Sequence, residues 1–251
     1  MKWRSLEEST VKTETRSLRE VFAERKELIA KYVPAETQAV HNRVVAELQA
    51  SGIAERALQP NGSAPEFELP DQNGKPARSA DLLETGSLVI CFIRGRWDPF
   101  CVGQVEAMNA IISQLQLLGA RLVAISPQTV HHNFLMADQH KLQFPLLSDG
   151  GNQIARQFGI VYGVPDYQQE VYKRVFVNLP FINGEPSWEL PIPATFIVGR
   201  HRNATDQLNQ QVAEPQNVSG TVKIFHTSAN PDYTSRPEPA DLLDFIAHLS
   251  S

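Results

Sequence analysis

Residues 88–93, LVICFI, form a continuous apolar run that leaves few folds open to this chain. Strand residues point alternately to the two faces of a sheet, so a run that is apolar at every position indicates a strand covered on both sides. Helix-like segments follow at 102–118 and about 129–140, with a second strand-like run at 121–126 between them. This alternation of strand and helix predicts an α/β protein with parallel strands.

The segment after the first apolar run places a cysteine at the start of a helix. Asp98 is a typical N-cap and Pro99 a typical first helical residue, which makes Cys101 the third residue of the helix. Its N–H is then expected within reach of the Asp98 carboxylate. Helix N-termini favour a thiolate over a thiol, and reactive cysteines are expected there. The alternative is a buried cysteine that serves only as a small apolar filler.

Composition narrows the class of protein. The chain has 251 residues, of which 42% are hydrophobic, enough for one large α/β domain with an extension. A net charge of -5 and no long basic run argue against nucleic acid as a partner. No apolar run approaches the roughly 20 residues that span a bilayer, and the N-terminus lacks the apolar segment of a secretory signal. We therefore expect a cytoplasmic protein that does not bind membranes.

No metal or cofactor site is indicated by the residue pattern. Two cysteines exclude a disulfide framework and a four-cysteine zinc site. Cys91 lies within the apolar run and is expected to fill the core, roughly 10 Å or more from Cys101, too far for a disulfide. His131 and His132 are adjacent, so on a helix they diverge by about 100° and do not make a paired metal face.

Residues 1–59 are predicted to form a helical extension, and residues 60–251 the main domain. A stripe that includes Leu18, Val21, Phe22, Leu28 and Ile29 indicates one helix, and a second is predicted from about 35 to 48. Two amphipathic helices cannot bury their stripes alone. We expect them to pack on the main domain or on a partner subunit.

The main domain is predicted to begin with a hairpin that turns at Asn73 and Gly74, followed by a short helix capped by Ser79. Further along, residues 165–179 are expected to be helical, 180–193 an irregular loop and 200–218 an exposed polar insertion. Strands at 194–198 and 221–226 and a helix at about 240–249 complete the order of elements.

The order of these segments resembles the thioredoxin fold in its peroxiredoxin form. The chain is similar to the alkyl hydroperoxide reductase/thiol-specific antioxidant family, and most to a bacterial branch with a helical N-terminal extension. The segments that carry the resemblance are SAPEFELPDQNGKPARSADLL, VICFIRGRWDPFC, GARLVAISPQT, FPLLSDGGNQIARQFGIVY, SWELPIPATFIV and DYTSRPEPADLL. The resemblance implies a mixed central sheet flanked by helices, and a homodimer.

By this resemblance Cys101 corresponds to the peroxidatic cysteine, whose thiolate attacks a peroxide and becomes a sulfenic acid. Arg94 is expected to lower the thiol pKa or steady the leaving oxygen, with Arg96 a weaker candidate. Trp97, Pro99 and Phe100 would form a wall of the substrate pocket. Pro193 and Thr195, in a segment similar to the thioredoxin cis-proline loop, would line its other side.

Three residues depart from the family pattern. Asp98 stands where peroxiredoxins usually have a threonine and the related branch often has a cysteine, and a carboxylate there opposes thiolate formation. Arg94 replaces the usual proline seven residues before the cysteine. The arginine that a later strand usually supplies is not found where it is expected, because Pro193 stands there.

These features imply a one-cysteine peroxidase, since no resolving cysteine follows from the pattern. Its substrates would be hydrogen peroxide or small organic hydroperoxides. An external thiol, which could be thioredoxin-, glutaredoxin- or glutathione-like, would reduce the sulfenic acid. Two alternatives remain open. Asp98 could make the chain a redox-silent binding or scaffold protein, or Cys101 could carry out thiol–disulfide exchange.

Overall fold

A mixed five-stranded sheet organises the protein, which is described here from a computed structural model covering residues 16–200 and 221–249. The strands are ordered β5-β4-β3-β8-β9. β4 runs parallel to β3 and to β5, whereas β8 is antiparallel to β3 and to β9. The strands are β3 (Leu88–Phe92), β4 (Arg121–Ser126), β5 (Leu146–Ser148), β8 (Ala194–Arg200) and β9 (Val222–Ala229). The predicted mixed sheet is therefore confirmed.

Alternation along β3 divides the core into two layers. Leu88, Ile90 and Phe92 face one cluster of buried side chains, and Val89 and Cys91 face the other. All five residues of β3 are buried, as its uniform apolarity predicted.

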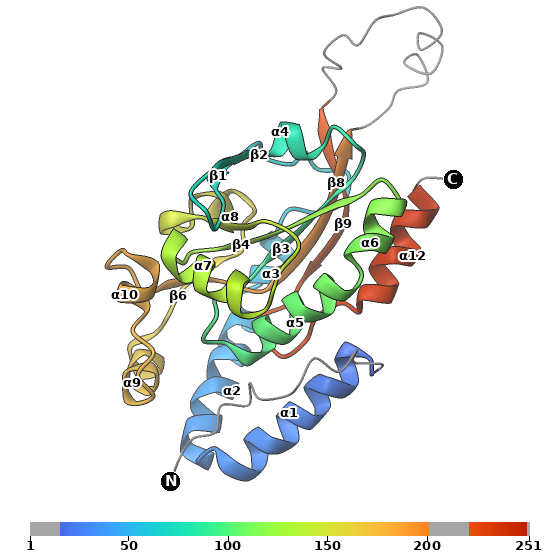
Figure 1. The fold of residues 1–251 in the computed structure, drawn as a ribbon. Coiled ribbons are helices and arrows are strands. Elements are labelled where there is room, and N and C mark those ends of the chain that lie inside the picture. The colour runs from blue at the N-terminus through green and yellow to red at the C-terminus, as the bar shows by residue number, and fades with distance from the viewer. Residues whose placement is uncertain (1–15, 201–220, 250–251) are drawn as a thin grey trace, which may run out of the picture.

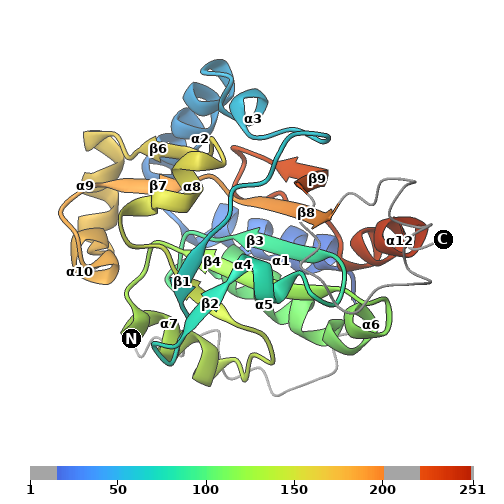
Figure 2. The same ribbon diagram turned by 90° about the horizontal axis from the view of Figure 1, so that it is seen from above.

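Helices cover both faces of the sheet, as Figures 1 and 2 show. One face carries α5 (Pro99–Ala110), α6 (Ile112–Leu117), α7 (Val130–Gln139) and α12 (Pro239–Leu249). The other carries α3 (Ile53–Arg56), α4 (Ser79–Leu82), α8 (Gln153–Gln157) and α9 (Asp166–Arg174), with a short 3-10 turn, η1 (Gly150–Asn152), before α8.

Several predicted elements differ from the structure. The helix at 102–118 is interrupted at Ile111, whose φ of -104° and ψ of 7° leave the helical region. The helix predicted for 165–179 ends at Arg174, and Phe176 adopts a positive φ of 62°. Ser79 is a helical residue rather than the cap, and its hydroxyl accepts a hydrogen bond from the Phe67 N–H.

Residues 180–193 are not wholly irregular. They include most of α10 (Leu179–Asn183) and the strand β7 (Glu189–Pro191), which pairs with β6 (Val161–Gly163). The hairpin of β1 (Glu68–Pro70) and β2 (Pro76–Arg78) forms as predicted. The predicted insertion at 200–218 lies, apart from Arg200, outside the described residues.

The N-terminal extension packs on the main domain. It consists of α1 (Leu18–Tyr32) and α2 (Ala35–Ala50), followed by α3. α1 lies against the N-terminal part of α5 in Figure 1, where the Phe22 and Phe100 rings meet edge to face at 5.0 Å. Glu238 accepts hydrogen bonds from the backbone N–H groups of Leu18 and Arg19, which ties the start of α1 to the turn before α12.

Candidate active site

Cys101 lies at the junction that the sequence predicted, between the end of β3 and the first turn of α5. Asp98 is the N-cap, Pro99 is the first helical residue and Cys101 the third. The cap differs in one detail, because Asp98 Oδ1 accepts its hydrogen bond from the Phe100 N–H at 3.0 Å and not from Cys101. The other carboxylate oxygen is thereby left to face the thiol.

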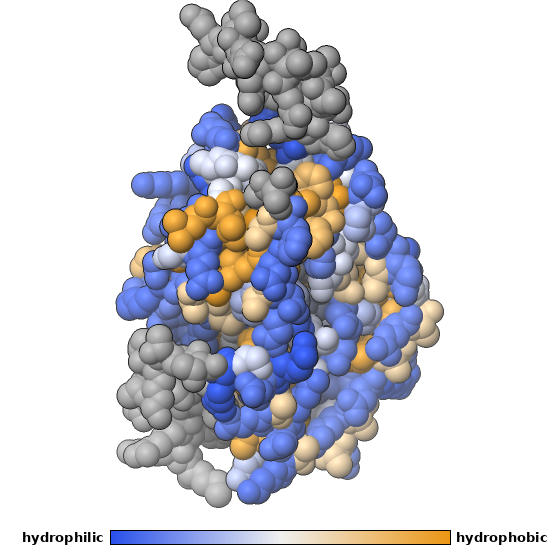
Figure 3. Space-filling model, turned by 90° about the vertical axis from the view of Figure 1, so that its right-hand side faces the viewer, coloured by the Kyte–Doolittle hydropathy of each residue, from blue (hydrophilic) through white to orange (hydrophobic). Residues whose placement is uncertain are grey.

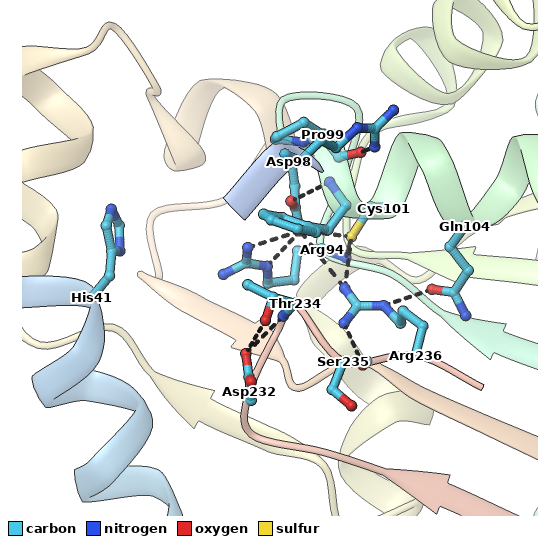
Figure 4. A network of polar contacts seen from close by, with 12 residues as sticks. His41, Arg94, Asp98, Pro99, Cys101, Gln104, Asp232, Thr234, Ser235 and Arg236 are labelled. Carbon is cyan, nitrogen blue, oxygen red and sulfur yellow. Dashed lines mark hydrogen bonds and ion pairs between the residues drawn. The ribbon is translucent and has the colours of Figure 1, made fainter. Parts of the chain in front are cut away.

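Three groups approach the sulfur of Cys101, as Figure 4 shows. Its S–H donates to Asp98 Oδ2 at 2.8 Å, and the backbone N–H of Arg94 donates to Sγ at 3.3 Å. The Nη2 atom of Arg236 lies 3.7 Å from Sγ. One acceptor and two donors around the sulfur can hold either the thiol or the thiolate.

Arg94 and Asp98 form a buried ion pair beside the sulfur. Nε and Nη2 of Arg94 each lie 2.8 Å from Asp98 Oδ2, and the two side chains are 4% and 1% exposed. Two aromatic rings hold the guanidinium, with Tyr233 at 4.1 Å and Trp97 at 5.1 Å from its central carbon. Arg236 Nη2 also lies 3.9 Å from Asp98 Oδ2, so loss of Asp98 would leave two buried guanidinium groups without this partner, which makes the pair costly to break.

The surroundings shift the pKa values of Asp98 and Cys101 in opposite directions. Burial would raise the pKa of Asp98, but Arg94 and Arg236 outweigh it and hold this pKa below its usual value. Burial and the Asp98 charge raise the pKa of Cys101 to about 11, against the opposing effect of the two arginines. In this arrangement the thiol, not the thiolate, is the populated form of Cys101 at pH 7. The expectation that Asp98 opposes the thiolate agrees with this direction.

Arg236 is an arginine beside the sulfur that the sequence pattern did not reveal, and Pro193 still stands at the position of the family's later arginine. Arg236 comes from the turn before α12, and its Nε donates to Gln104 Oε1 at 2.8 Å while Nη2 faces the sulfur. Gln104 in turn donates to the Thr195 hydroxyl at 3.3 Å. Arg236 lies in the segment DYTSRPEP, which was among those that carried the family resemblance. The resemblance therefore pointed to this segment, but it did not identify Arg236 as a site residue.

The other predicted pocket residues have distinct places. Phe100 is buried between Phe22 and Tyr233, and Trp97 packs on Arg94. Thr195 reaches the site only through Gln104. The Arg96 side chain is exposed, so it does not join the cluster.

Pro193 does not form a cis-proline loop. The described residues contain no cis peptide bond, so the bond from Ile192 to Pro193 is trans. The Pro193 carbonyl accepts a hydrogen bond from the Asn230 N–H at 3.2 Å. Pro193 therefore anchors the start of the turn that carries Tyr233 and Arg236.

Cys91 and Cys101 are both free and buried. Burial raises the pKa of Cys91 to about 12, and the Thr195 hydroxyl lies 3.8 Å from its sulfur. Cys91 packs in the same core layer as Cys101, as expected for an apolar filler.

The site is covered in this conformation. Cys101 has no exposed surface, and Phe100 is 1% exposed. On α1, Arg25 donates to the Pro99 carbonyl, and both Phe22 and Arg25 contact α5 at Gly103, where a Cβ would lie 2.8 Å from the Phe22 ring. A reagent can reach the sulfur only after some of this cover moves.

Phe22→Ala is expected to speed alkylation of Cys101 by N-ethylmaleimide about thirtyfold. Losing the buried ring weakens the docking of α1 by roughly 2 kcal/mol, the free energy of burying such a side chain, and each 1.4 kcal/mol changes an opening equilibrium tenfold. Peptide mass spectrometry after timed quenching measures the rate at Cys101 alone. Phe181→Ala is the matched control, because that ring is 70% exposed on α10. Equal rates in all three proteins would contradict the role of α1 as a cover.

Comparison with known proteins identifies relatives of this chain. The family model described as the AhpC/TSA family matches residues 60–206. A peroxiredoxin of Mycobacterium tuberculosis is 31% identical over 112 residues, which cover 45% of this chain and 73% of that protein. Peroxiredoxin Bcp of Escherichia coli is 28% identical over 115 residues, covering 46% and 72% of the two chains.

Solved structures share the fold at low sequence identity. Peroxidoxin BcpB of Mycobacterium tuberculosis aligns with a TM-score of 0.54 at 21% identity, over 77% of this chain and 99% of that one. A yeast mitochondrial 1-Cys peroxiredoxin aligns with a TM-score of 0.52 at 16% identity, over 76% of each chain. None of the helices within residues 16–200 and 221–249 is long and apolar enough to cross a membrane.

Proposed function

This chain belongs to the AhpC/TSA family and is a thiol peroxidase of the peroxiredoxin type, and we propose that it works as a one-cysteine enzyme through Cys101. The observation that carries this proposal is the placement of Cys101 at the start of α5 with Arg94 and Arg236 beside it. Cys91 is held within β3 in the sheet core, where its sulfur contacts the Thr195 hydroxyl, and this position favours Cys101 as the reacting thiol.

The chemical step transfers one oxygen atom to sulfur. The Cys101 thiolate attacks the outer oxygen of a hydroperoxide, so that an S–O bond forms as the O–O bond breaks. Cysteine is oxidised to a sulfenic acid, and the peroxide is reduced to water or an alcohol. Arg236 and the Arg94 N–H face the sulfur, where they stabilise the negative charge that moves toward the leaving oxygen.

We assign Asp98 to the movement of the proton. Its Oδ2 accepts from the Cys101 S–H, so the proton released by the thiol has an acceptor at 2.8 Å. The protonated carboxyl can then donate to the leaving oxygen, which balances the reaction. The low pKa of Asp98 makes this transfer costly while Arg94 stays paired with it. We therefore assign the covered arrangement to the resting state. The reaction requires a conformational change that admits peroxide to Cys101 and weakens the ion pair between Arg94 and Asp98.

An external thiol completes the cycle in this proposal. Its sulfur attacks the sulfenic acid, releasing water and forming a mixed disulfide, which a second thiol resolves to restore Cys101. In the yeast mitochondrial 1-Cys peroxiredoxin, thiol resolution proceeds via glutathione/thioredoxin systems. We propose the same class of reductant here: a thioredoxin-, glutaredoxin- or glutathione-like thiol.

A cytoplasmic location and a homodimer are further parts of the proposal. The stripe of α1 that suggested a partner is used within the chain, since Leu18 and Phe22 are buried in a cluster with Phe100. A different surface supports dimerisation. Figure 3 shows apolar side chains gathered on the face that α6 and α12 cover. Leu117, the last residue of α6, is 88% exposed, and Leu249, the last residue of α12, is 41% exposed. A second copy of this chain would remove that apolar surface from water.

The proposed function is tested by the rate at which hydrogen peroxide oxidises Cys101 between pH 7 and 10, with Asp98→Thr alongside. Since the thiol pKa is raised to about 11, the thiolate becomes more populated as pH rises, and the native rate should climb up to tenfold per pH unit. Removing the carboxylate lowers the thiol pKa but also removes the proton donor to the leaving oxygen, so the rate of Asp98→Thr should reach its plateau at a lower pH than the native rate and at a lower maximum.

Trapping of the sulfenic acid with dimedone, read by mass spectrometry, gives the rate. No sulfenic acid in the native protein at any of these pH values, together with rapid formation in Asp98→Thr, would instead identify a redox-silent binding protein. A mixed disulfide that forms with oxidised glutathione in the absence of peroxide would identify thiol–disulfide exchange, because the Cys101 thiolate would attack that disulfide and release one reduced glutathione.

A further inference from the structure

Gln104 lies on the buried face of α5, one helical turn after Cys101. Residues three apart on a helix share a face, so the two side chains point to the same side of α5. Gln104 is 1% exposed, and in Figure 4 its amide is directed toward Arg236. Its partners lie on two other segments, the turn before α12 and the strand β8. This amide therefore joins three parts of the fold beside the sulfur.

The hydrogen bonds of the Gln104 amide fix its orientation. Arg236 Nε can only donate, so the atom of Gln104 that it meets at 2.8 Å is the carbonyl oxygen Oε1. The amide nitrogen Nε2 is then left to donate to the Thr195 hydroxyl at 3.3 Å. Thr195 lies within β8 and has no exposed surface. A strand of the central sheet thus orients the side chain that meets the arginine.

Arg236 receives little support from its own turn. Its Nη1 donates to the carbonyl of the neighbouring Ser235, an exposed residue of the same irregular turn. Its Nη2 faces Cys101 at 3.7 Å and Asp98 at 3.9 Å. Gln104 is an uncharged partner that ties the guanidinium to a helix. Because the guanidinium is planar and rigid, a fixed Nε also restrains where Nη2 can lie.

The place of Nη2 matters for the reactivity of the sulfur. Burial and the charge of Asp98 raise the pKa of Cys101, and Arg236 opposes them more strongly than Arg94 does. A guanidinium that turned away from Cys101 would leave Arg94 alone to oppose Asp98. It would also remove a donor from the charge that develops as the thiolate attacks peroxide. The rate of oxidation therefore depends on where the Arg236 guanidinium is held.

We infer that Gln104 is the positioning residue that holds Arg236 against the sulfur of Cys101, and that Thr195 orients Gln104 for this contact. The inference rests on the proposed function, because it concerns the rate of the same oxidation. It assigns Thr195 a role other than lining the substrate pocket. Pro193 stands where the family's later arginine is expected, so in this chain the supporting arginine comes from a turn and is anchored on α5.

Gln104→Met in the full chain tests this inference, since methionine has a similar length but offers Arg236 no amide oxygen. The measurement is the rate of sulfenic acid formation at Cys101 with hydrogen peroxide at pH 8, trapped with dimedone. We expect a rate about tenfold lower than the native one, because a hydrogen bond to a charged group is lost. Gln168→Met is the matched control: Gln168 is equally buried, lies on α9 and donates to the Tyr172 hydroxyl. Its rate should equal the native rate.

Two further comparisons separate positioning from a structural effect. Added to Arg236→Met, Gln104→Met should slow the reaction no further, because the side chain that it positions is already gone. Thr195→Val removes the hydroxyl at nearly constant size and should slow the reaction about threefold, since it leaves the Gln104 amide nitrogen without its partner. Thr195→Ser keeps a hydroxyl and should react at the native rate.

A native rate in Gln104→Met would overturn the inference. So would a further tenfold loss in the double variant with Arg236→Met, because Gln104 would then act independently of the arginine. If Gln104→Met does not fold, as thermal unfolding would reveal, equal rates in Thr195→Val and Thr195→Ser would contradict the inference and a lower rate in Thr195→Val alone would support it. If hydrogen peroxide forms no sulfenic acid at native Cys101, it is the proposed function that fails.

Discussion

Cys101→Ser should abolish thiol-dependent peroxide consumption, a loss of at least about a thousandfold, while Cys91→Ala keeps most of it. Serine has nearly the size of cysteine but cannot form a sulfenic acid, so the first change removes the reacting atom and little else. Cys91 is 1% exposed within β3, and its replacement leaves the groups around Cys101 in place. A coupled assay of peroxide consumption with dithiothreitol as reductant measures both.

The Cys91→Ala variant also decides the one-cysteine proposal. If Cys91 served as a resolving thiol, the native protein treated with peroxide in the absence of added thiol would form a Cys91–Cys101 disulfide, whereas Cys91→Ala would keep its sulfenic acid. Persistence of the same sulfenic acid in both proteins would exclude that role. Circular dichroism and thermal unfolding of both variants provide the folding control, since a buried cysteine-to-alanine change costs about 1–2 kcal/mol.

Local pattern predicted the part of the site that is contiguous in sequence. The uniform apolarity of β3, the Asp98 N-cap and Pro99 at the first helical position were enough to place Cys101 in the first turn of α5. These features depend on neighbours within a few residues, and such preferences act in the same way in most folds.

Contacts between distant segments were not predictable in this way. Arg236 meets Cys101 across 135 residues, and it lies in an irregular turn that has no periodicity to reveal which way a side chain points. Tyr233 sits in the same turn, and its contact with Arg94 depends on how this turn packs. The sequence predicted that α1 would pack on the main domain or on a partner subunit, but not that it would lie over the start of α5.

Dependence on contacts between distant segments also explains the errors in the predicted helices and strands. β6 and β7 have three residues each, too short for the alternation of a strand to be read. Residues 180–193 contain four prolines and one glycine, which favoured an irregular loop, although most of α10 and all of β7 form there. Pairing with a distant strand, rather than local preference, stabilises β7.

Arg236→Met should slow the oxidation of Cys101 about a hundredfold. The arginine is the one side-chain cation facing the sulfur directly among the contacts described, at 3.7 Å, and it opposes the effect of Asp98 on the thiol pKa. Removing it raises the thiol pKa above its already elevated value and removes a donor to the charge that develops in the reaction. Loss of one such donor typically costs two to three orders of magnitude in rate.

Arg236→Lys separates charge from geometry. Lysine keeps the positive charge but cannot hold Gln104 and the sulfur with two nitrogens of one planar group. Its rate should therefore lie between those of the native protein and Arg236→Met. Arg174→Met, which removes an exposed arginine on α9, is the control for net charge. A shift of the pH–rate profile to higher pH in Arg236→Met is the readout that a purely structural role would not produce. Native-like rates with an unshifted profile would remove Arg236 from the site and leave Arg94 as the cation that supports the thiolate.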